Sequence, residues 1–248
     1  MDPNHQLHSN PNRHGRLNCD RCWKNVLHNQ QEVGSFRLVR DPGHWGSANP
    51  STLVLGISKG NTQSNAFANG QFDPVAFSGI RPRLLEVLQT VGLLADDSLS
   101  RFNRRFCGEE KEYAFASVVR CSLTGMDRKK GFHTADSPNV VPALKAGSAG
   151  YKFAFACVDQ HLRSLPPATL RVVLLGTTDA YIKHLRALIG LARGGLRPIN
   201  DMAYHAGGVL FVHVSHPSRG NGWFGAFCRG EATSGVKMRL AREALATR

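Results

Sequence analysis

The stretch Thr52–Gly56, Thr-Leu-Val-Leu-Gly, decides the fold class, because it is a short apolar run that ends on a glycine. A run of this kind, followed by a polar loop, is typical of a buried strand that ends in a turn. Three other runs have the same character: residues 113–119 (YAFASVV), 170–175 (LRVVLL) and 209–214 (VLFVHV). The sequence therefore predicts four buried strands.

Between these runs, apolar residues recur at the spacing of an α-helix. This spacing predicts helices over residues 83–94, 153–165, 179–191 and 232–246. Residues 57–78, rich in Asn, Ser and Gly, are expected to form a loop. Strands that alternate with helices favour an α/β fold with a mostly parallel, four-stranded central sheet.

The length of 248 residues fits one sizeable domain. We expect residues 1–18, rich in Asn, His and Pro, to form a flexible tail, and residues 19–248 to form a single domain. A basic segment at about residues 122–150 is longer than an ordinary loop and is expected to be a functional or mobile insertion.

The formal net charge is +13, from 31 Lys and Arg against 18 Asp and Glu. Such a balance favours a polyanionic partner, most commonly nucleic acid, although a basic surface kept for solubility is the alternative. No apolar stretch approaches the roughly 18–20 residues that span a bilayer, and the first thirty residues lack a signal-peptide core. We therefore expect a cytoplasmic protein with no membrane partner.

Ligands of parallel sheets bind beyond the carboxyl ends of the strands. Three segments of this chain lie at the ends of predicted strands: residues 56–60 (Gly-Ile-Ser-Lys-Gly), residues 120–121 (Arg-Cys) and residues 215–218 (Ser-His-Pro-Ser). We expect them to converge on one site.

Cysteine spacing gives a second candidate site. Cys19 and Cys22 form a Cys-x-x-Cys pair, and in a reducing cytoplasm such a pair favours metal or redox chemistry over a disulfide. A metal site needs about four ligands, so two more must come from distant parts of the chain.

The order of these motifs resembles the uracil-DNA glycosylase superfamily. Residues 56–60 (Gly-Ile-Ser-Lys-Gly) resemble its first motif, Phe77-Ser78-Gly79 resembles its Phe-x-Gly, and His216-Pro217-Ser218 matches its His-Pro-Ser. The resemblance covers roughly residues 19–230 and implies a three-layer α/β sandwich. It also implies a DNA repair enzyme that flips out uracil, or a related deaminated base, and hydrolyses the N-glycosidic bond without a catalytic metal.

The iron–sulfur branch of the superfamily resembles this chain most. Its ligand order implies a structural 4Fe–4S cluster on Cys19, Cys22, Cys121 and Cys157, with zinc in the same thiolates as the alternative. Cys107 and Cys228 are left over.

The resemblance also implies roles for single residues. His216 donates a hydrogen bond to the departing base, Phe77 stacks on that base, and Ser117 reads its edge where relatives have Asn. The backbone of residues 56–60, which includes Gly56, Ile57, Lys59 and Gly60, holds uracil oxygens or water. Phe72 is the alternative to Phe77 as the stacking ring, and a core position is the alternative for Phe77 itself.

The first motif departs from the family, because Ile57, Ser58 and Lys59 occupy places where relatives carry a water-positioning Asp, Asn or Glu. Ser58 itself, or Asn61, Gln63 or Asp73 from the following loop, are the candidates for that role.

Two further segments are candidate DNA contacts. Residues 127–133 resemble a basic loop whose terminal His, here His133, traps uracil-DNA covalently in one subclass; the alternatives are phosphate contacts and a solvated loop. Residues 218–223 follow the His-Pro motif and resemble a segment that enters the minor groove; the alternative is a tight glycine turn with Trp223 packed inward. The candidate DNA-binding residues are Arg128, Lys129, Lys130, His133, Ser218, Arg219, Asn221 and Trp223.

Two other functions stay open. One is a catalytically weak or inactive DNA-binding protein on the same scaffold. A variant of this hypothesis is that the protein traps uracil-DNA. The other is an unrelated α/β enzyme acting on a nucleotide. The sequence carries no P-loop and no dinucleotide-binding glycine pattern, so we expect no nucleotide cofactor, and we expect a monomer.

Overall fold

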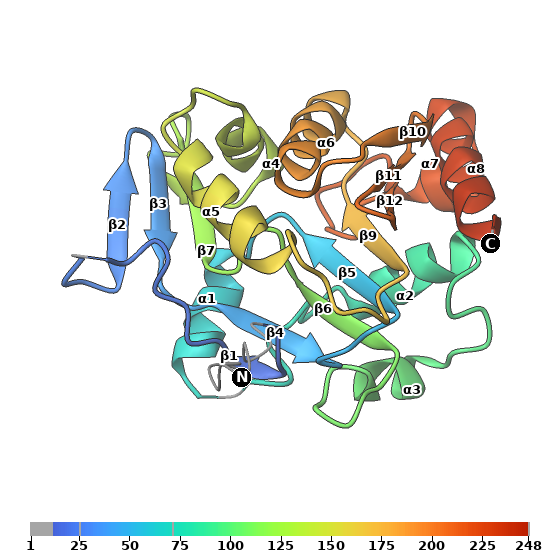
Figure 1. Cartoon of the computed structure of the whole chain (residues 1–248), viewed down its shortest axis with the longest axis horizontal. Coiled ribbons are helices and arrows are strands. Elements are labelled where there is room, and N and C mark those ends of the chain that lie inside the picture. Colours follow the sequence, from blue (N-terminus) through green and yellow to red (C-terminus); the bar gives the residue numbers. More distant parts are fainter. Residues whose placement is uncertain (1–11, 25, 71, 248) are drawn as a thin grey trace, which may run out of the picture.

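A computed structural model describes residues 12–24, 26–70 and 72–247 of the chain (Figure 1). Its main sheet has eight strands. In their order across the sheet these are β1 (Gly15–Arg16), β4 (Gly43–Gly46), β6 (Tyr113–Ser117), β5 (Thr52–Gly56), β9 (Arg171–Leu175), β12 (Val209–Val214), β11 (Ala203–Ala206) and β10 (Arg197–Asn200).

The predicted α/β class is confirmed, but the prediction of a four-stranded sheet is wrong. The four predicted strands are neighbours and pair in parallel, as β6-β5-β9-β12. Antiparallel strands extend the sheet beyond β6 and beyond β12, which makes it mixed. These outer strands could not be predicted from the sequence because they lack long apolar runs: β4 reads Gly-His-Trp-Gly, and β10 contains Pro198.

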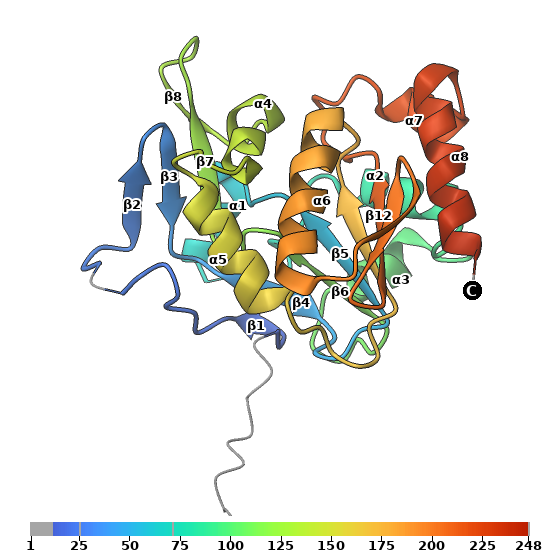
Figure 2. The same cartoon turned by 45° about the horizontal axis from the view of Figure 1, so that its top comes forward.

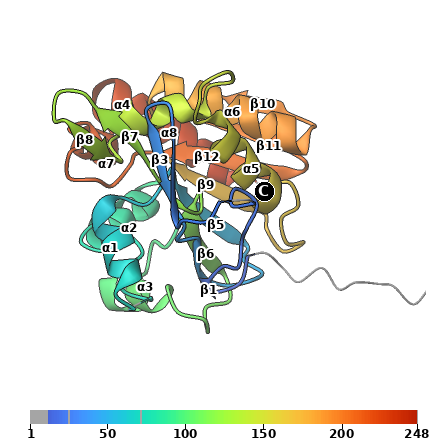
Figure 3. The same cartoon turned by 90° about the vertical axis from the view of Figure 1, so that its left-hand side faces the viewer.

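Helices cover both faces of this sheet, since alternate strand residues point into two separate cores. Leu53 and Leu55 of β5 pack with the helices α5 and α6, whereas Val54 packs with α2, α3, α7 and α8. Figure 3 shows α1, α2 and α3 on one side of the sheet and α5 and α6 on the other. The helix bounds are α1 (Asn61–Ala68), α2 (Arg81–Thr90), α3 (Leu99–Arg104), α5 (Tyr151–His161), α6 (Asp179–Arg193), α7 (Phe224–Arg229) and α8 (Ala232–Ala246).

The helix predictions hold for α8 in full and for α2, α5 and α6 with shifted ends. Helices α1, α3 and α7 had no sequence prediction. Helix α1 lies inside residues 57–78, which were expected to form a loop, because its Asn- and Ser-rich sequence lacks an apolar face apart from Phe67.

The basic segment at residues 122–150 is folded and not a plain loop. It forms β7 (Ser122–Asp127), β8 (Phe132–Thr134), α4 (Ser137–Val140) and a short 3-10 helix, η1 (Val141–Leu144). Strands β7 and β8 form a hairpin that joins β2 (Gln30–Val33) and β3 (Phe36–Val39) in a second, antiparallel sheet ordered β2-β3-β7-β8. The hairpin projects from the body of the molecule in Figure 2.

Part of the expected N-terminal tail lies outside the described residues, which begin at Asn12. From there on the chain is packed: Asn12 and Leu17 are buried, and β1 pairs with β4. Within the described residues, no helix has the length and apolar character needed to cross a membrane.

Candidate functional site

The strand order places a candidate site at the carboxyl ends of β5 and β9. The chain runs from β5 to its neighbour β6 on one side and returns to β9 on the other side of β5. In open α/β sheets, ligands bind at such a reversal of strand order. Gly56 and Ser117, which end β5 and β6, are register partners there. Beyond them the two loops stay together, since the Val118 N–H donates to the Gly56 carbonyl at 2.7 Å.

His216 follows the neighbouring strand β12 at the same end of the sheet, as predicted. The Ser218 backbone N–H donates to Nδ1 of His216 at 3.1 Å. A neutral imidazole whose Nδ1 accepts must carry its proton on Nε2. Burial, together with the positive charge of Arg83, lowers the pKa of His216 to about 4. The ring is therefore neutral near pH 7 and has one N–H available to a ligand.

Asn221 holds the loop that carries His216. Its side-chain amide donates to the Ser215 hydroxyl at 3.0 Å and to the His216 carbonyl at 2.8 Å. Its Oδ1 accepts the Trp223 backbone N–H, and its own N–H donates to the Ser218 carbonyl. These contacts fix the loop from within, a role that the sequence analysis did not assign to Asn221.

Arg83, at the start of α2, connects this loop to the segment that carries Phe77. Its guanidinium lies 4.0 Å from the ring centre of Phe224, just after the His216 loop, and its charge acts on His216. Helix α2 begins three residues after Ser78, so the His216 and Phe77 segments meet at this end of the sheet. Sequence reasoning missed Arg83, since nothing in its local pattern sets it apart from a surface cation.

Phe77 lies against Gly56. A Cβ built on Gly56 would lie 3.8 Å from Cε1 of the Phe77 ring, which is ordinary van der Waals distance. Phe77 has a positive φ of 54°, which is rare for a side chain of this size. Its ring also packs near Phe106 and Phe115, so it belongs partly to the core, as the alternative interpretation held. Phe72, the competitor, stacks on Trp45 at 4.6 Å.

The side chains of the first motif are occupied within the protein. Ile57 is buried in the core. The Ser58 hydroxyl accepts the Leu123 N–H at 2.7 Å. Lys59 is buried, donates to the Arg120 carbonyl and lies 3.5 Å from Asp41 Oδ1. Any contact of this segment with a ligand therefore comes from its backbone and from Gly56 and Gly60.

Ser117 lies beside this motif with a buried side chain. Its carbonyl accepts Nη1 of Arg120 at 2.7 Å. Its hydroxyl forms no hydrogen bond with any of the described residues, so that group is available to a ligand.

The three other candidates for positioning water differ in exposure and in the hydrogen bonds that their side chains already make. Asn61 is exposed, and its amide donates to the His133 carbonyl at 3.1 Å, which leaves Oδ1 as an acceptor. Gln63 donates to the Val75 carbonyl at 3.3 Å. Asp73 is exposed but forms an ion pair of 3.1 Å with Nε2 of His14. Asn61 and Gln63 thus each keep a side-chain oxygen as an acceptor, and Asn61 is the more exposed of the two.

The basic hairpin places its cations at an exposed tip. Arg128 and Lys129 are exposed, and neither belongs to an ion pair among the described residues. Lys130 instead pairs with Asp127 at 3.4 Å and Asp136 at 2.8 Å. Phe132, which had no predicted role, is 55% exposed beside this tip.

His133 is buried at the base of the hairpin, next to Asn61. Burial lowers the pKa of its imidazole, and the Arg37 charge lowers it further.

Trp223 is 70% exposed, so the alternative in which it packs inward is wrong. Arg219 is also exposed and lies within the turn that the Asn221 N–H closes onto the Ser218 carbonyl. Sequence reasoning therefore located an exposed aromatic and an exposed cation beside His216.

The four cysteines of the predicted metal site gather in space. The Cys22 and Cys157 thiols hydrogen-bond to each other. Cys19 acts electrostatically on Cys22 and Cys157, and so does Cys121. Segments far apart in the sequence are thus brought to one place.

Backbone amides point at these sulfurs. The N–H groups of Arg21, Arg120 and Asp41 donate to Cys19, Cys157 and Cys121, respectively. Burial, together with the neighbouring Cys157, raises the pKa of Cys121 to about 12. The hydrogen bond with Cys157 lowers the pKa of Cys22. Amide donors of this kind stabilise thiolates.

The thiols are gathered without forming a closed ligand shell. Over residues 12–24, 26–70 and 72–247, no three His, Cys, Asp or Glu side chains are placed so that they could hold a metal ion as they stand. The Cys22–Cys157 hydrogen bond is a contact that free thiols make. The donor set fits a tetrathiolate centre in its residue types.

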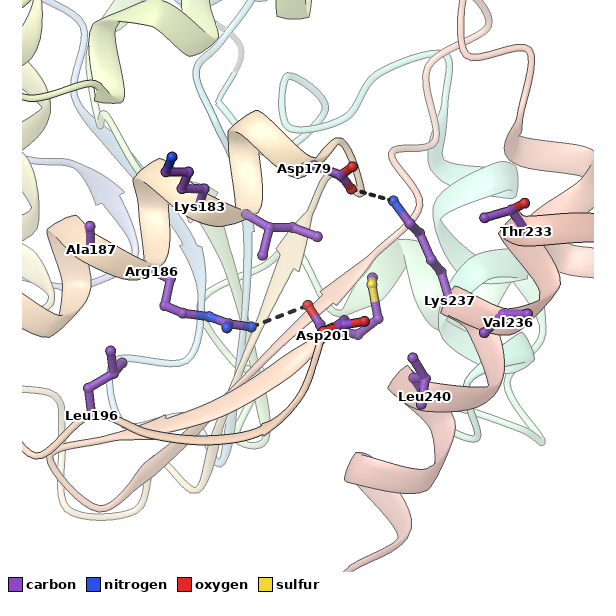
Figure 4. Close-up of a pocket in the computed structure, with 12 residues that line it drawn as sticks. Asp179, Lys183, Arg186, Ala187, Leu196, Asp201, Thr233, Val236, Lys237 and Leu240 are labelled. Carbon is purple, nitrogen blue, oxygen red and sulfur yellow. Dashed lines mark hydrogen bonds and ion pairs between the residues drawn. The ribbon is translucent and has the colours of Figure 1, made fainter.

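A cavity of about 630 Å³ lies elsewhere, between α6 and α8 at the outer strands β10 and β11 (Figure 4). Lys237 crosses its mouth to Asp179 at 2.9 Å, and Arg186 donates to the Asp201 carbonyl at 3.2 Å. None of the residues predicted from the sequence lines this cavity. It therefore adds no support to the site at the strand ends.

No family model matches the chain, and no curated protein matches it.

Proposed function

We propose that this chain is a DNA glycosylase of the uracil-DNA glycosylase type, which excises uracil or a related deaminated base. The observation that carries the proposal is the hydrogen bond from the Ser218 N–H to Nδ1 of His216, at the carboxyl end of a parallel strand. It leaves a neutral imidazole with an Nε2–H donor next to the loops that end β5 and β6.

This donor fits the chemistry of base release. Cleavage of an N-glycosidic bond leaves positive charge on the sugar and negative charge on the departing base. A preorganised N–H donor stabilises such an anion most where water is excluded. Because the pKa of His216 is lowered to about 4 by burial, the imidazole stays neutral and keeps a fixed hydrogen-bonding direction.

The neighbouring residues supply the rest of the proposed base site. Phe77 offers a ring face beside Gly56, whose missing side chain admits a flat base edge. The Ser117 hydroxyl lies at the adjacent strand end and hydrogen-bonds to that edge. Asn61 orients the attacking water through its free Oδ1.

The proposed DNA contacts flank this site. Arg128 and Lys129 bind phosphates from the hairpin tip, and Arg219 does so from the His216 loop. Trp223 and Phe132 are exposed aromatic rings, each beside those cations, and they stack on bases or fill the gap that a flipped nucleotide leaves.

Cys19, Cys22, Cys121 and Cys157 hold a structural metal centre in this proposal, a 4Fe–4S cluster or zinc. The centre ties the N-terminal segment to the loop after β6 and to α5, and it supplies stability rather than a reaction step. The three backbone N–H donors to sulfur favour the thiolate form that either metal requires.

The test is excision on oligonucleotides with a single uracil, single-stranded or opposite G or A. Alkaline cleavage reveals abasic sites, and a denaturing gel without alkali reveals a covalent adduct. The proposal predicts abasic sites that depend on His216. Metal analysis of the purified chain, with Cys157→Ser and the leftover cysteine variant Cys228→Ser, tests the metal centre separately. Loss of metal is expected in Cys157→Ser alone.

A DNA-binding protein without excision activity is the second candidate. It is favoured by the first motif, where Ser58 and Lys59 are both bound within the protein and no carboxylate is present. Tight binding to uracil-DNA without base release would support this candidate. An adduct that His133→Ala abolishes would indicate covalent trapping.

A further inference from the structure

Arg120 is a buried cation without an acidic partner. It lies in the loop between β6 and β7 and is 1% exposed. Nη1 donates to the Ser117 carbonyl at 2.7 Å and Nη2 donates to Asn12 Oδ1 at 3.2 Å. Its Nε has no hydrogen-bond partner in the described part of the chain. Both acceptors are neutral, and no carboxylate forms an ion pair with Arg120 among residues 12–24, 26–70 and 72–247.

The other polar side chains around Arg120 do not balance its charge. Nδ1 of His161 lies at hydrogen-bond distance, 3.2 Å, from Asn12 Oδ1. Nε2 of His44 lies 2.9 Å from the Ser47 carbonyl oxygen. Both rings interact with Arg120 as groups that repel it when protonated. An arginine stays protonated in proteins, and a buried charge without a counter-charge is strongly unfavourable.

Arg120 does lie among the cysteines. The next residue is Cys121, the Arg120 backbone N–H donates to the Cys157 sulfur, and the guanidinium interacts electrostatically with Cys157 and Cys19. Four thiolates around Zn²⁺ or a [4Fe–4S]²⁺ core leave a net charge of about −2. A centre of this kind supplies the missing negative charge.

We propose that Arg120 is the buried counter-charge of an anionic tetrathiolate centre on Cys19, Cys22, Cys121 and Cys157, held in place by Ser117 and Asn12. Arg120 is a positioning residue in this arrangement and is not a metal ligand. Its buried positive charge stabilises the anionic, metal-bound centre. The inference rests on the metal centre of the proposed function and goes beyond it by assigning what stabilises its charge.

The test uses the full chain and measures metal affinity, not excision. Zn²⁺ affinity is measured by chelator competition in the wild type, Arg120→Met and Arg120→Lys. Loss of an outer-shell partner weakens metal binding about 10- to 100-fold, and we expect this for Arg120→Met. Arg120→Lys keeps the charge and most of the affinity. Arg193→Met is the control, because Arg193 is half-buried and, like Arg120, donates to backbone carbonyls, here those of Ala206 and Gly207.

Asn12→Asp gives a second variant that retains Arg120. It places a carboxylate against Nη2, where it competes with the centre for the same charge, so Zn²⁺ affinity falls here too. After anaerobic reconstitution with ferrous iron and sulfide, the reduction potential of Arg120→Met is expected to be more negative than that of the wild type. Removal of a nearby positive charge disfavours an added electron.

The outcomes separate the two levels of the argument. If Arg120→Met or Asn12→Asp binds Zn²⁺ as tightly as the wild type, Arg120 is not the counter-charge, while the metal centre stands. If Arg193→Met weakens binding as much as Arg120→Met, the effect is structural and the inference is overturned. If the wild type retains neither zinc nor an iron–sulfur cluster, the metal centre itself is wrong and the inference is wrong with it.

Discussion

The Ser218 backbone N–H donates to Nδ1 of His216, and this single contact fixes which nitrogen of the imidazole faces outward with a proton. The two residues belong to the turn that follows β12, and Asn221 holds that turn through the Ser215 hydroxyl and the His216 carbonyl. A backbone donor cannot be removed by side-chain substitution, so the tautomer depends on the turn itself.

The pairing of Gly56 with Phe77 predicts that a methyl group at position 56 blocks the base site. A Cβ there would contact the Phe77 ring at 3.8 Å, which is ordinary van der Waals distance, so the fold tolerates Gly56→Ala. We expect a stability change within about 0.5 kcal/mol and a loss of kcat/KM for excision of roughly 10- to 100-fold.

Gly46→Ala provides the structural contrast. A Cβ on Gly46 would lie 2.5 Å from the Tyr113 carbonyl oxygen, at a φ of +86°. This variant should lose about 1–3 kcal/mol in urea unfolding. If Gly56→Ala destabilises as strongly, or excises normally, Gly56 has no special place beside the substrate.

The basic hairpin predicts unequal effects of neighbouring cations on DNA binding. Arg128→Ala and Lys129→Ala should each lower the slope of log affinity against log salt by about one, because each releases one phosphate contact. Lys130→Ala should lower it by less, since Lys130 already pairs with Asp127 and Asp136. Fluorescence anisotropy of a labelled duplex at several salt concentrations measures these slopes. Equal slopes in all three variants would contradict the hairpin contact.

Lys59 is predicted to act in stability rather than in substrate binding. Its ammonium lies 3.5 Å from Asp41, which also accepts hydrogen bonds from the Ser122 N–H and hydroxyl and from the Ser64 hydroxyl. Lys59→Met leaves this carboxylate buried without its cation, which should cost about 3–5 kcal/mol in urea unfolding. The double variant with Asp41→Asn should recover part of the loss. A stable Lys59→Met with a raised KM would place Lys59 in the substrate site instead.

Buried histidines predict a loss of stability in mild acid. Burial lowers the pKa of His44 and His213 to about 3 and that of His161 to about 2, all below the value of about 6.5 in the unfolded chain. Below pH 6.5 the unfolded state binds protons that the folded state does not. Stability is therefore fully present above that pH and falls as the pH drops, by up to about 1.4 kcal/mol per pH unit for each group.

Urea unfolding of the metal-free chain between pH 7.5 and pH 5 measures this slope. His213→Gln should flatten it by about one proton. A slope that is unchanged in this variant would mean that His213 does not remain neutral in the folded chain.

The central strands could be predicted from the sequence because each is a contiguous apolar run, buried on both faces. Strands β4 and β10 could not: β10 is an edge strand, which needs no such run, and Trp45 is the single large apolar residue of β4. The hairpin of β7 and β8 was hidden for a related reason. One of its faces is polar, and its tip reads as a solvated basic loop.

The candidate site could be predicted as far as strand ends and motifs reach. The position of His216 at a strand end and the exposure of Trp223 agree with expectation. The burial of Lys59 could not be foreseen, because its partner Asp41 comes from another part of the chain. Arg120 was missed for the same reason: its significance lies in the absence of an acidic neighbour, which only the fold reveals.

The measurement that tests the account most directly is single-turnover excision of uracil from a labelled oligonucleotide by wild type and His216→Ala. The account predicts abasic sites with the wild type, a rate that is constant between about pH 5.5 and pH 8 because the pKa of His216 is about 4, and a rate about 10²- to 10³-fold lower in the variant. The control is Lys183→Ala, which removes a charge from the unrelated cavity at α6; its excision rate should match that of the wild type. Excision by His216→Ala at the wild-type rate, or no excision by a wild type that binds the DNA, would contradict it.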